Sequence, residues 1–156
     1  IKELHYKKQP WAFHEGICIV SPDVGAIKRA ENLRQYALRK KANVLPLVTG
    51  IKERNAQGDI TYSGFIGKIR KHCIVVDDIC DGGRTFIELE KRLRRQGATH
   101  VYLFVSHGIF SHNWPELSMR YNEIGCTDSY RDIDMFQCLN FRCKVFPYDE
   151  LLINKP

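Results

Sequence analysis

A strand-like apolar run that ends in carboxylates and a glycine-containing loop is the feature that most constrains the fold of this chain. Residues 74–85 read Ile-Val-Val-Asp-Asp-Ile-Cys-Asp-Gly-Gly-Arg-Thr, and a helical pattern opens at Phe86. In an open α/β sheet, ligands bind outside the carboxyl ends of the strands. We therefore expect a strand, a ligand-facing loop and a helix, in this order.

The same segment offers both halves of a sugar-phosphate site. Backbone N–H groups at a helix N-terminus suit a phosphate, and carboxylates at a strand end suit sugar hydroxyls or a hydrated magnesium ion. The alternative is a buried strand followed by a helix N-cap, because Asp and Thr both cap well. The combination of Asp77, Asp78 and Asp81 with Gly82 and Gly83 favours a binding site over a simple cap.

Length and composition indicate one ordinary globular domain. The chain has 156 residues, of which 44% are hydrophobic and 27% charged, as in soluble domains with a substantial core. No apolar run approaches the ~20 residues of a membrane span, and no signal peptide is visible. We expect no membrane association and a cytoplasmic location.

The six cysteines and six histidines lack the spacing of a metal site or a disulfide framework. No Cys-x-x-Cys pair occurs, several cysteines fall within strand-like runs, and His107 and His112 are five residues apart rather than four. Buried thiols in a reducing compartment are therefore expected.

The net charge of +6 leaves several kinds of partner open. Nucleic acid, small polyanionic substrates and solvated helix faces are all compatible with a basic chain. No nucleic-acid-binding module is recognisable, so no nucleic-acid partner is expected. Glu88 with Arg92 and Glu90 with Arg94 have the i,i+4 spacing of ion pairs on an exposed helix face.

The hydrophobic pattern alternates strands with helices. It predicts strands over 17–20, 44–48, 73–76 and 101–105, with further candidates over 124–127 and 143–146. It predicts helices over 25–40, 86–96 and 113–121, a helical turn at 149–153, and a loop or mobile hairpin over 50–68, whereas residues 1–14 fit no element. The alternation predicts a three-layer α/β fold with a central, mostly parallel sheet of about five strands flanked by helices.

Two more strand ends carry residues suited to a ligand. Residues 21–25, Ser-Pro-Asp-Val-Gly, follow the first strand, and the glycine permits close backbone approach, although an ordinary N-cap is equally compatible. Residues 49–55 carry Lys52 and Arg54, which could reach a polyphosphate, although surface loops often carry such cations. All three strand ends belong on one edge of a parallel sheet, where one ligand would touch them together.

Five segments in one order resemble the C-terminal half of the ribose-phosphate pyrophosphokinases, the enzymes that make phosphoribosyl pyrophosphate. The similarity covers roughly residues 15–112. The Asp-Asp loop alone resembles any type I phosphoribosyltransferase, whereas the Ser-Pro-Asp, Lys-x-Arg and Ser-His-Gly-Ile-Phe-Ser segments resemble the synthetase. The five segments are Ile-Val-Ser-Pro-Asp-Val-Gly-Ala-Ile-Lys-Arg-Ala (19–30), Lys-Glu-Arg-Asn (52–55), Val-Val-Asp-Asp-Ile-Cys-Asp-Gly-Gly-Arg-Thr (75–85), Gly-Ala-Thr-His-Val-Tyr (97–102) and Ser-His-Gly-Ile-Phe-Ser (106–111).

The resemblance implies a role for each matching residue. Lys52 and Arg54 match the basic pair of the catalytic flexible loop, and Asp77 and Asp78 match the carboxylates that hold the ribose hydroxyls. Asp23 matches a magnesium-binding Asp in the pyrophosphate region, to which Val24 and Gly25 also belong. The 5-phosphate loop is matched by Asp81, Gly82, Gly83, Arg84 and Thr85.

The resemblance also implies the reaction and its cofactor. The 1-hydroxyl of ribose-5-phosphate attacks the β-phosphorus of ATP, and AMP leaves. Mg²⁺ and protein cations stabilise charge on the phosphate oxygens, so alignment and electrostatics carry the catalysis. ATP and ribose-5-phosphate are therefore the expected substrates, and Mg²⁺ is the expected cofactor.

Two residues depart from the family pattern. Arg84 stands where the family usually has Gly, and Ala26 stands at the second glycine after Ser-Pro-Asp. An arginine could crowd the loop or add a guanidinium to the phosphate. Bidentate arginine contacts suit phosphate well, which favours the second interpretation.

The family has two similar α/β domains, and its N-terminal domain supplies most of the ATP contacts. This chain resembles only the second domain, so we expect residues 1–156 to be a single phosphoribosyltransferase-like domain without that N-terminal domain. It would be a fragment of a larger enzyme or a trimmed domain that needs a partner. The family builds its ATP site across subunits, which implies a homo-oligomer.

Two other functions remain open. A phosphoribosyltransferase of nucleotide or NAD salvage uses the same loop but needs a base-binding hood, for which residues 1–14 are a poor candidate. A non-catalytic regulatory subunit of the synthetase would be favoured by loss of Lys52 or Arg54, and both are present.

Overall fold

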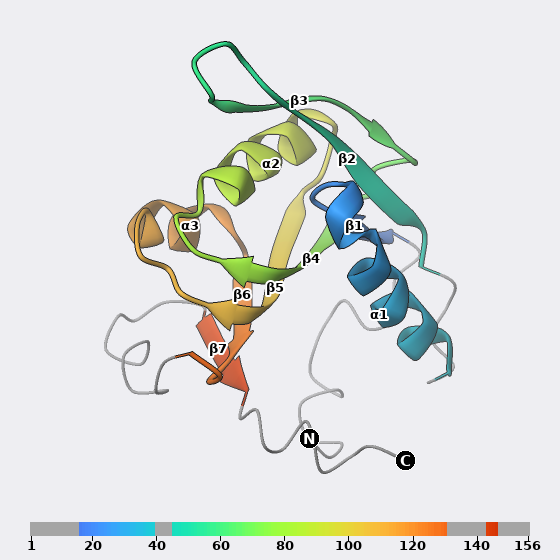
Figure 1. The fold of residues 1–156 in the computed structure, drawn as a ribbon. Coiled ribbons are helices and arrows are strands. Elements are labelled where there is room, and N and C mark those ends of the chain that lie inside the picture. The colour runs from blue at the N-terminus through green and yellow to red at the C-terminus, as the bar shows by residue number, and fades with distance from the viewer. Residues whose placement is uncertain (1–15, 40–44, 131–142, 147–156) are drawn as a thin grey trace.

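The alternating pattern folds into one seven-stranded sheet in the computed structural model, which describes residues 16–39, 45–130 and 143–146. The strand order is β3-β2-β1-β4-β5-β6-β7, and all pairings are parallel except that of β2 with β3. The predicted α/β fold is confirmed, with more strands than the expected five or so. The strands are β1 Ile17–Ser21, β2 Leu47–Arg54, β3 Ile60–Ile66, β4 His72–Cys80, β5 His100–Gly108, β6 Glu123–Thr127 and β7 Cys143–Phe146 (Figure 1).

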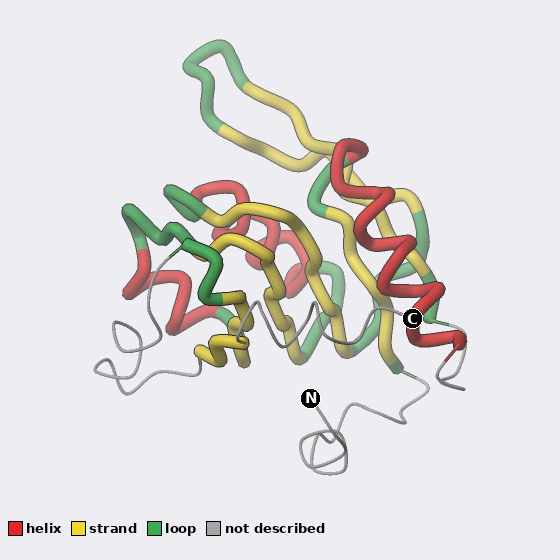
Figure 2. Tube along the Cα trace, turned by 60° about the horizontal axis from the view of Figure 1, so that its bottom comes forward, coloured by secondary structure: helices red, strands yellow, loops and turns green. Residues whose placement is uncertain are grey.

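Helices cover both faces of the sheet and complete a three-layer fold (Figures 1 and 2). On one face, α1 packs against β1 and β4. On the other face, α2 and α3 contact each other and cover the larger apolar core. The helical segments are the 3-10 helix η2 Val24–Ala26, α1 Ile27–Arg39, α2 Arg84–Arg95 and α3 Trp114–Arg120.

The alternation of side chains along the strands divides the core between the two faces. On the α1 face, Ile17 and Ile74 belong to a small cluster against which Leu33 packs. On the α2 face, the neighbouring residues Cys18 and Cys73 join the larger cluster. The central strands are therefore apolar on both faces, which explains the continuous apolar runs in the sequence.

Two strands extend further than their apolar runs predict. β4 continues through Asp77 and Asp78 because β5 keeps pairing with it, with Asp77 opposite Val105. β2 continues because β3 pairs with it, with Lys52 opposite Tyr62. Asp77 and Asp78 therefore lie at the end of β4, and Lys52 and Arg54 lie at the end of β2, rather than on the loops that follow.

Residues 50–68, predicted as a loop or a hairpin, form the outer part of the β2–β3 hairpin, which projects beyond the sheet (Figure 1). The Asn55 side-chain oxygen accepts the N–H groups of Gln57 at 3.1 Å and Asp59 at 2.8 Å. Gly58 takes a positive φ of 83° in the same turn. The hairpin turn is therefore fixed by the side chain of its first residue.

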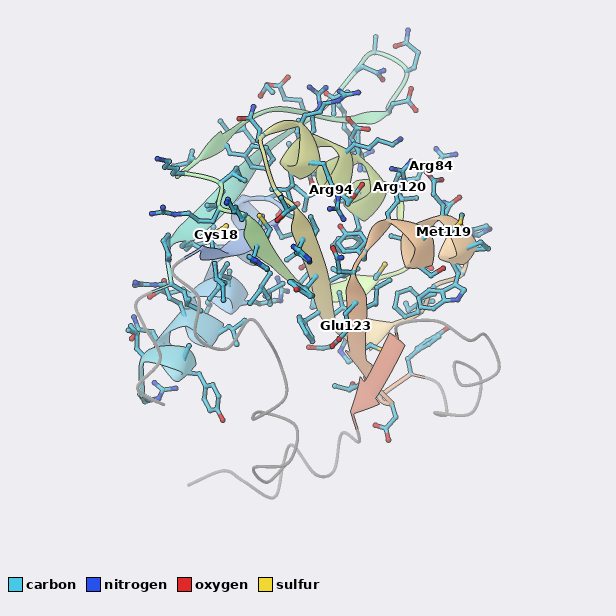
Figure 3. All side chains as sticks on the ribbon, turned by 180° about the vertical axis from the view of Figure 1, so that it is seen from behind. Cys18, Arg84, Arg94, Met119, Arg120 and Glu123 are labelled. Carbon is cyan, nitrogen blue, oxygen red and sulfur yellow. The ribbon has the colours of Figure 1, made fainter. Side chains whose placement is uncertain are left out.

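One of the two predicted surface ion pairs is buried, so that part of the prediction was wrong. Glu90 is only 4% exposed, and its carboxylate lies 2.5 Å from Arg94 Nε and 3.3 Å from Arg120 Nη1. Figure 3 shows Arg94 and Arg120 next to each other. Arg94 Nη2 also donates to Arg120 O at 3.0 Å. The pair Glu88–Arg92 lies nearer the surface, as predicted. The i,i+4 spacing predicts a solvated Glu90 carboxylate, but this carboxylate is buried because α3 packs over it.

The thiols of Cys18, Cys73, Cys80 and Cys126 are buried, which confirms the expected burial for these four. Within the described ranges, no helix has the length and apolar character needed to span a membrane. Residues 1–14 and the predicted turn at 149–153 lie outside the described residues.

Candidate functional site

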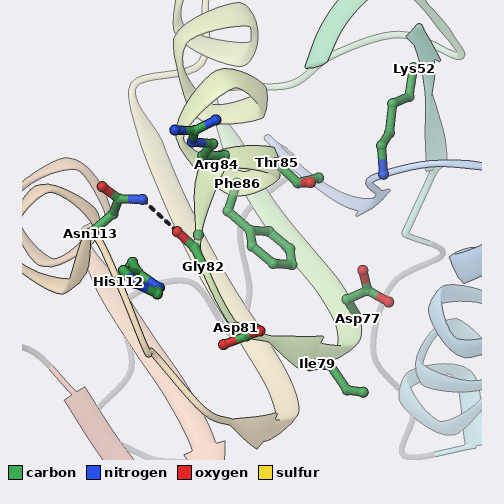
Figure 4. A pocket seen from close by; sticks show the side chains of 11 residues that line it. Lys52, Asp77, Ile79, Asp81, Gly82, Arg84, Thr85, Phe86, His112 and Asn113 are labelled. Atoms are coloured by element: carbon green, nitrogen blue, oxygen red, sulfur yellow. Dashed lines mark hydrogen bonds between the residues drawn. The ribbon is translucent and has the colours of Figure 1, made fainter. Parts of the chain in front are cut away.

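The carboxyl ends of β2 and β4 border a pocket of about 610 Å³, a size typical of small-ligand sites. It lies beside the reversal of strand order between β1 and β4, where open α/β sheets bind ligands. The pocket brings together most of the predicted site residues. Its lining consists of Lys52, Asp77, Ile79, Asp81, Gly82, Gly83, Arg84, Thr85, Phe86, His112 and Asn113 (Figure 4).

The loop between β4 and α2 has the backbone that an anion site needs. Gly83 takes a φ of 75°, and a Cβ there would lie 2.5 Å from Leu117 Cδ1, so only glycine fits. The Ile87 N–H donates to Gly83 O at 3.0 Å and so opens α2. The N–H groups of Arg84 and Thr85 precede this bond and have no carbonyl partner within the helix. They are therefore available to a phosphate.

Arg84 is the first residue of α2, two residues earlier than the sequence places the start of this helix. It is exposed and lines the pocket. Among the described residues other than glycine, only Phe110 and Asn113 have positive φ. The position of Arg84 therefore does not require glycine, and the arginine does not strain the loop backbone.

Arg29 contacts both strand-end carboxylates. Its Nη2 pairs with Asp78 Oδ2, and its Nη1 lies 3.6 Å from Asp77 Oδ1. Asp77 Oδ1 also accepts the Asp78 N–H at 2.9 Å. Burial, aided by the neighbouring Asp78 carboxyl, raises the pKa of Asp77 to about 6, although the Asp78 N–H and the Arg29 charge oppose the shift. This carboxyl therefore changes charge close to neutral pH.

Asp23 and Lys52 form an ion pair between the first two strand ends. Lys52 Nζ lies 3.0 Å from Asp23 Oδ2, and Asp23 Oδ1 accepts the Gly25 N–H at 2.9 Å. Partial burial would raise the pKa of Asp23, but Lys52 and the N–H groups of Gly25 and Ala26 outweigh it and hold this pKa below its usual range. The N-cap interpretation of residues 21–25 is thus confirmed, and the Asp23 carboxylate also pairs with the Lys52 ammonium group.

Some predicted site residues lie outside the pocket lining. Arg54 is exposed, and its Nη1 donates to Gly58 O at 3.0 Å, at the hairpin turn. Val24 and Gly25 are also exposed, at the start of η2. Asp78 faces Arg29. Lys52 and Arg54 are two residues apart on β2 and share one face of the strand, but only Lys52 reaches the pocket in this structure.

Three residues of the site were missed by sequence reasoning. The sequence gives only a weak indication for Arg29. It belongs to the basic pair Lys28-Arg29, which follows the Asp23 strand end within the predicted helix over 25–40. His112 and Asn113 directly follow the Ser-His-Gly-Ile-Phe-Ser segment, and their position after a strand end is the signal that could have identified them.

This site could bind magnesium only through a protein carboxylate together with waters and substrate phosphates. Within the described ranges, no three His, Cys, Asp or Glu side chains cluster in a way that could hold a metal ion. Mg²⁺ commonly binds through one or two carboxylates, waters and substrate phosphates rather than a protein cage. Asp23 suits this mode as a single carboxylate ligand, provided that Lys52 moves away from Oδ2.

The strand-end carboxylates, the glycine loop at a helix N-terminus and the mostly parallel sheet define a type I phosphoribosyltransferase-like domain. The family model described as the phosphoribosyl synthetase-associated domain matches residues 19–142. The chain belongs to this family, which confirms the resemblance read from its motifs.

Relatives named ribose-phosphate pyrophosphokinase share part of their length with this chain. The protein from Cereibacter sphaeroides is 37% identical over 110 residues, which cover 70% of this chain and 30% of the relative. The protein from Gloeobacter violaceus is 40% identical over 94 residues, which cover 60% and 27%. The crystal structure of phosphoribosylpyrophosphate synthetase from Mycobacterium smegmatis matches with a TM-score of 0.68 and 26% identity, covering 89% of this chain and 43% of that chain. The matched region is thus less than half of each of these proteins.

Proposed function

We propose that this chain is the ribose-5-phosphate-binding domain of a ribose-phosphate diphosphokinase and carries its catalytic cations. The observation that carries the proposal is one pocket lined by Lys52, Asp77 and the loop from Asp81 to Thr85. It combines a cation, a sugar-binding carboxylate and an anion-binding helix start. The names of the relatives support this reading over a phosphoribosyltransferase.

The phosphosugar is held by the loop and the strand end. Thr85, the free N–H groups at the start of α2 and the Arg84 guanidinium bind the 5-phosphate. Asp77 and Asp78 accept hydrogen bonds from the ribose hydroxyls. Arg29 contacts and orients these two carboxylates.

The reaction transfers a diphosphoryl group. The 1-hydroxyl oxygen of ribose-5-phosphate forms a bond to the β-phosphorus of ATP and releases its proton to water. The bond from that phosphorus to the α–β bridging oxygen breaks, and AMP leaves. Lys52 and Arg54 stabilise the negative charge that spreads over the phosphate oxygens. Arg54 requires a movement of the hairpin to do so, because it lies outside the pocket in this structure. Asp23 would hold Mg²⁺, which would supply further neutralisation of the pyrophosphate charge.

The same proposal extends to the partners of the chain. An N-terminal domain completes the ATP site, and the enzyme is a homo-oligomer with that site shared between subunits. The cytoplasm is the proposed location, because buried free thiols such as Cys18 and Cys73 suit a reducing compartment.

An assay of the complete enzyme tests this function directly. With ATP, Mg²⁺ and ribose-5-phosphate, we expect AMP and phosphoribosyl pyrophosphate in equal amounts. A transferase would instead consume phosphoribosyl pyrophosphate together with a base, without ATP. AMP release that does not depend on ribose-5-phosphate would contradict the proposal.

A further inference from the structure

We propose that Asn113 is a positioning residue for the phosphate loop, a role that rests on the proposed function of that loop. Asn113 stands at the N-cap of α3, where an Asn side chain ordinarily accepts an N–H of its own helix. It makes no such bond. Its Nδ2 instead donates to Gly82 O, 31 residues away, at 2.6 Å (Figure 4). The side-chain amide of Asn113 therefore bonds to a loop that lines the pocket rather than to its own helix.

The backbone of Asn113 is set for this contact. Its φ of 58° and ψ of 14° lie in the left-handed region, which Asn tolerates better than most residues. Its carbonyl still accepts the Leu117 N–H at 3.0 Å, so the residue remains anchored to the start of α3. The start of α3 thus holds the Asn113 side-chain amide in place to bond to Gly82 O.

The contact controls which backbone groups the loop presents. A carbonyl carries partial negative charge, so an anion site needs its carbonyls turned towards protein donors. Cys80 O accepts the N–H groups of Ile109 at 2.9 Å and Phe110 at 3.0 Å, and Gly82 O accepts the Asn113 amide. The segment between β5 and α3 therefore engages one carbonyl just before the loop and one within it, which favours presentation of N–H groups to a phosphate.

A second contact from the same helix start acts on the next residue of the loop. Leu117 packs against Gly83, because a Cβ built on this glycine would lie 2.5 Å from Leu117 Cδ1. The first turn of α3 thus holds Gly82 through a hydrogen bond and Gly83 through packing. The position of this helix start determines the position of the loop.

The variant Asn113→Gly separates the amide from the backbone, because glycine accepts the left-handed conformation without strain. In the full chain, we expect the dissociation constant for ribose-5-phosphate, measured by calorimetry, to rise roughly three- to tenfold, as for one lost hydrogen bond. Asn122→Ala is the matched control. The Asn122 side chain also makes a long-range bond, to the Val101 N–H at 2.8 Å, but far from the loop, so its loss should lower stability and leave the affinity unchanged.

A double-mutant cycle distinguishes positioning from direct contact. If Asn113 acts through the loop, the effects of Asn113→Gly and Thr85→Ala on affinity should be less than additive. A ligand-free measurement is exchange of the Ile87 amide hydrogen, which is bonded to Gly83 O; it should accelerate in Asn113→Gly.

The two proposals fail in different ways. If the folded wild-type chain binds no ribose-5-phosphate, the proposed function of the loop is wrong. If wild type binds and Asn113→Gly binds equally well, the positioning role is wrong. Unchanged Ile87 exchange in Asn113→Gly would also overturn that role, whatever the chain binds.

Discussion

Lys52 Nζ lies 3.0 Å from Asp23 Oδ2, so the cation proposed to act on the transferring phosphates is paired with the carboxylate proposed to meet magnesium. Each side chain gives the other a charged partner. A magnesium-bound polyphosphate would offer the metal to Asp23 and phosphate oxygens to Lys52, and would thereby separate the pair. Binding of such a substrate would thus release Lys52 from Asp23.

Lys52→Ala in the complete enzyme should reduce turnover by roughly a hundredfold or more, because a charge-stabilising group is lost from the transition state. The affinity for ribose-5-phosphate should barely change, since the 77–85 segment is the part of the chain proposed to hold that ligand. Steady-state kinetics with both substrates varied would measure the two effects. Lys68→Ala, an exposed lysine after the same hairpin, is the control and should retain full activity. Near-normal turnover in Lys52→Ala would contradict the catalytic role proposed for Lys52.

Arg84→Gly restores the usual family residue and yet should weaken binding of the phosphosugar. Arg84 lines the pocket from an ordinary helical position, so its guanidinium can contact the phosphate without crowding the loop. Loss of a charge-assisted contact predicts a roughly tenfold or greater rise in the dissociation constant. Calorimetric titration measures this, and tighter binding in the variant would show that the arginine obstructs the loop.

Asp77→Asn should change how stability depends on pH. The pKa of Asp77 is about 6 in the fold against an ordinary value of 3.8, so the folded state binds this proton more tightly than the unfolded chain does. The resulting stability is fully present below about pH 4 and is lost as pH rises through about 6. Because Asn does not titrate, the variant should gain about 1–3 kcal/mol relative to wild type between those limits. Urea unfolding at pH 4 and at pH 8 measures the difference; equal differences at both values would refute the shift.

The local patterns of the sequence predict much of this structure. The apolar runs identify β1, β4 and β5, and the glycine loop after Asp78 identifies the start of α2. The convergence of Lys52, Asp77 and Thr85 follows from one topological fact, that parallel strands end at one edge. These inferences succeed because they depend on periodicity and turn residues within short segments.

The remainder depends on contacts between distant segments. Arg29 meets Asp78 only after α1 has packed on the sheet, and Glu90 is buried only because α3 brings Arg120 over it. From its sequence position Asn113 would be taken only for a helix cap, and its bond to Gly82 forms because the fold brings the two residues together. Residues 60–66 become β3 because β2 offers an edge, not because of a strong apolar alternation.

The most direct test of the central claim is calorimetric titration of the full chain with ribose-5-phosphate. We expect a dissociation constant between millimolar and micromolar, about 4–8 kcal/mol of binding free energy. Asp81→Ala and Thr85→Ala should weaken binding without unfolding the domain, whereas Thr61→Ala on the hairpin should leave it unchanged. A folded wild-type chain that binds no phosphosugar would contradict the assignment of residues 77–85.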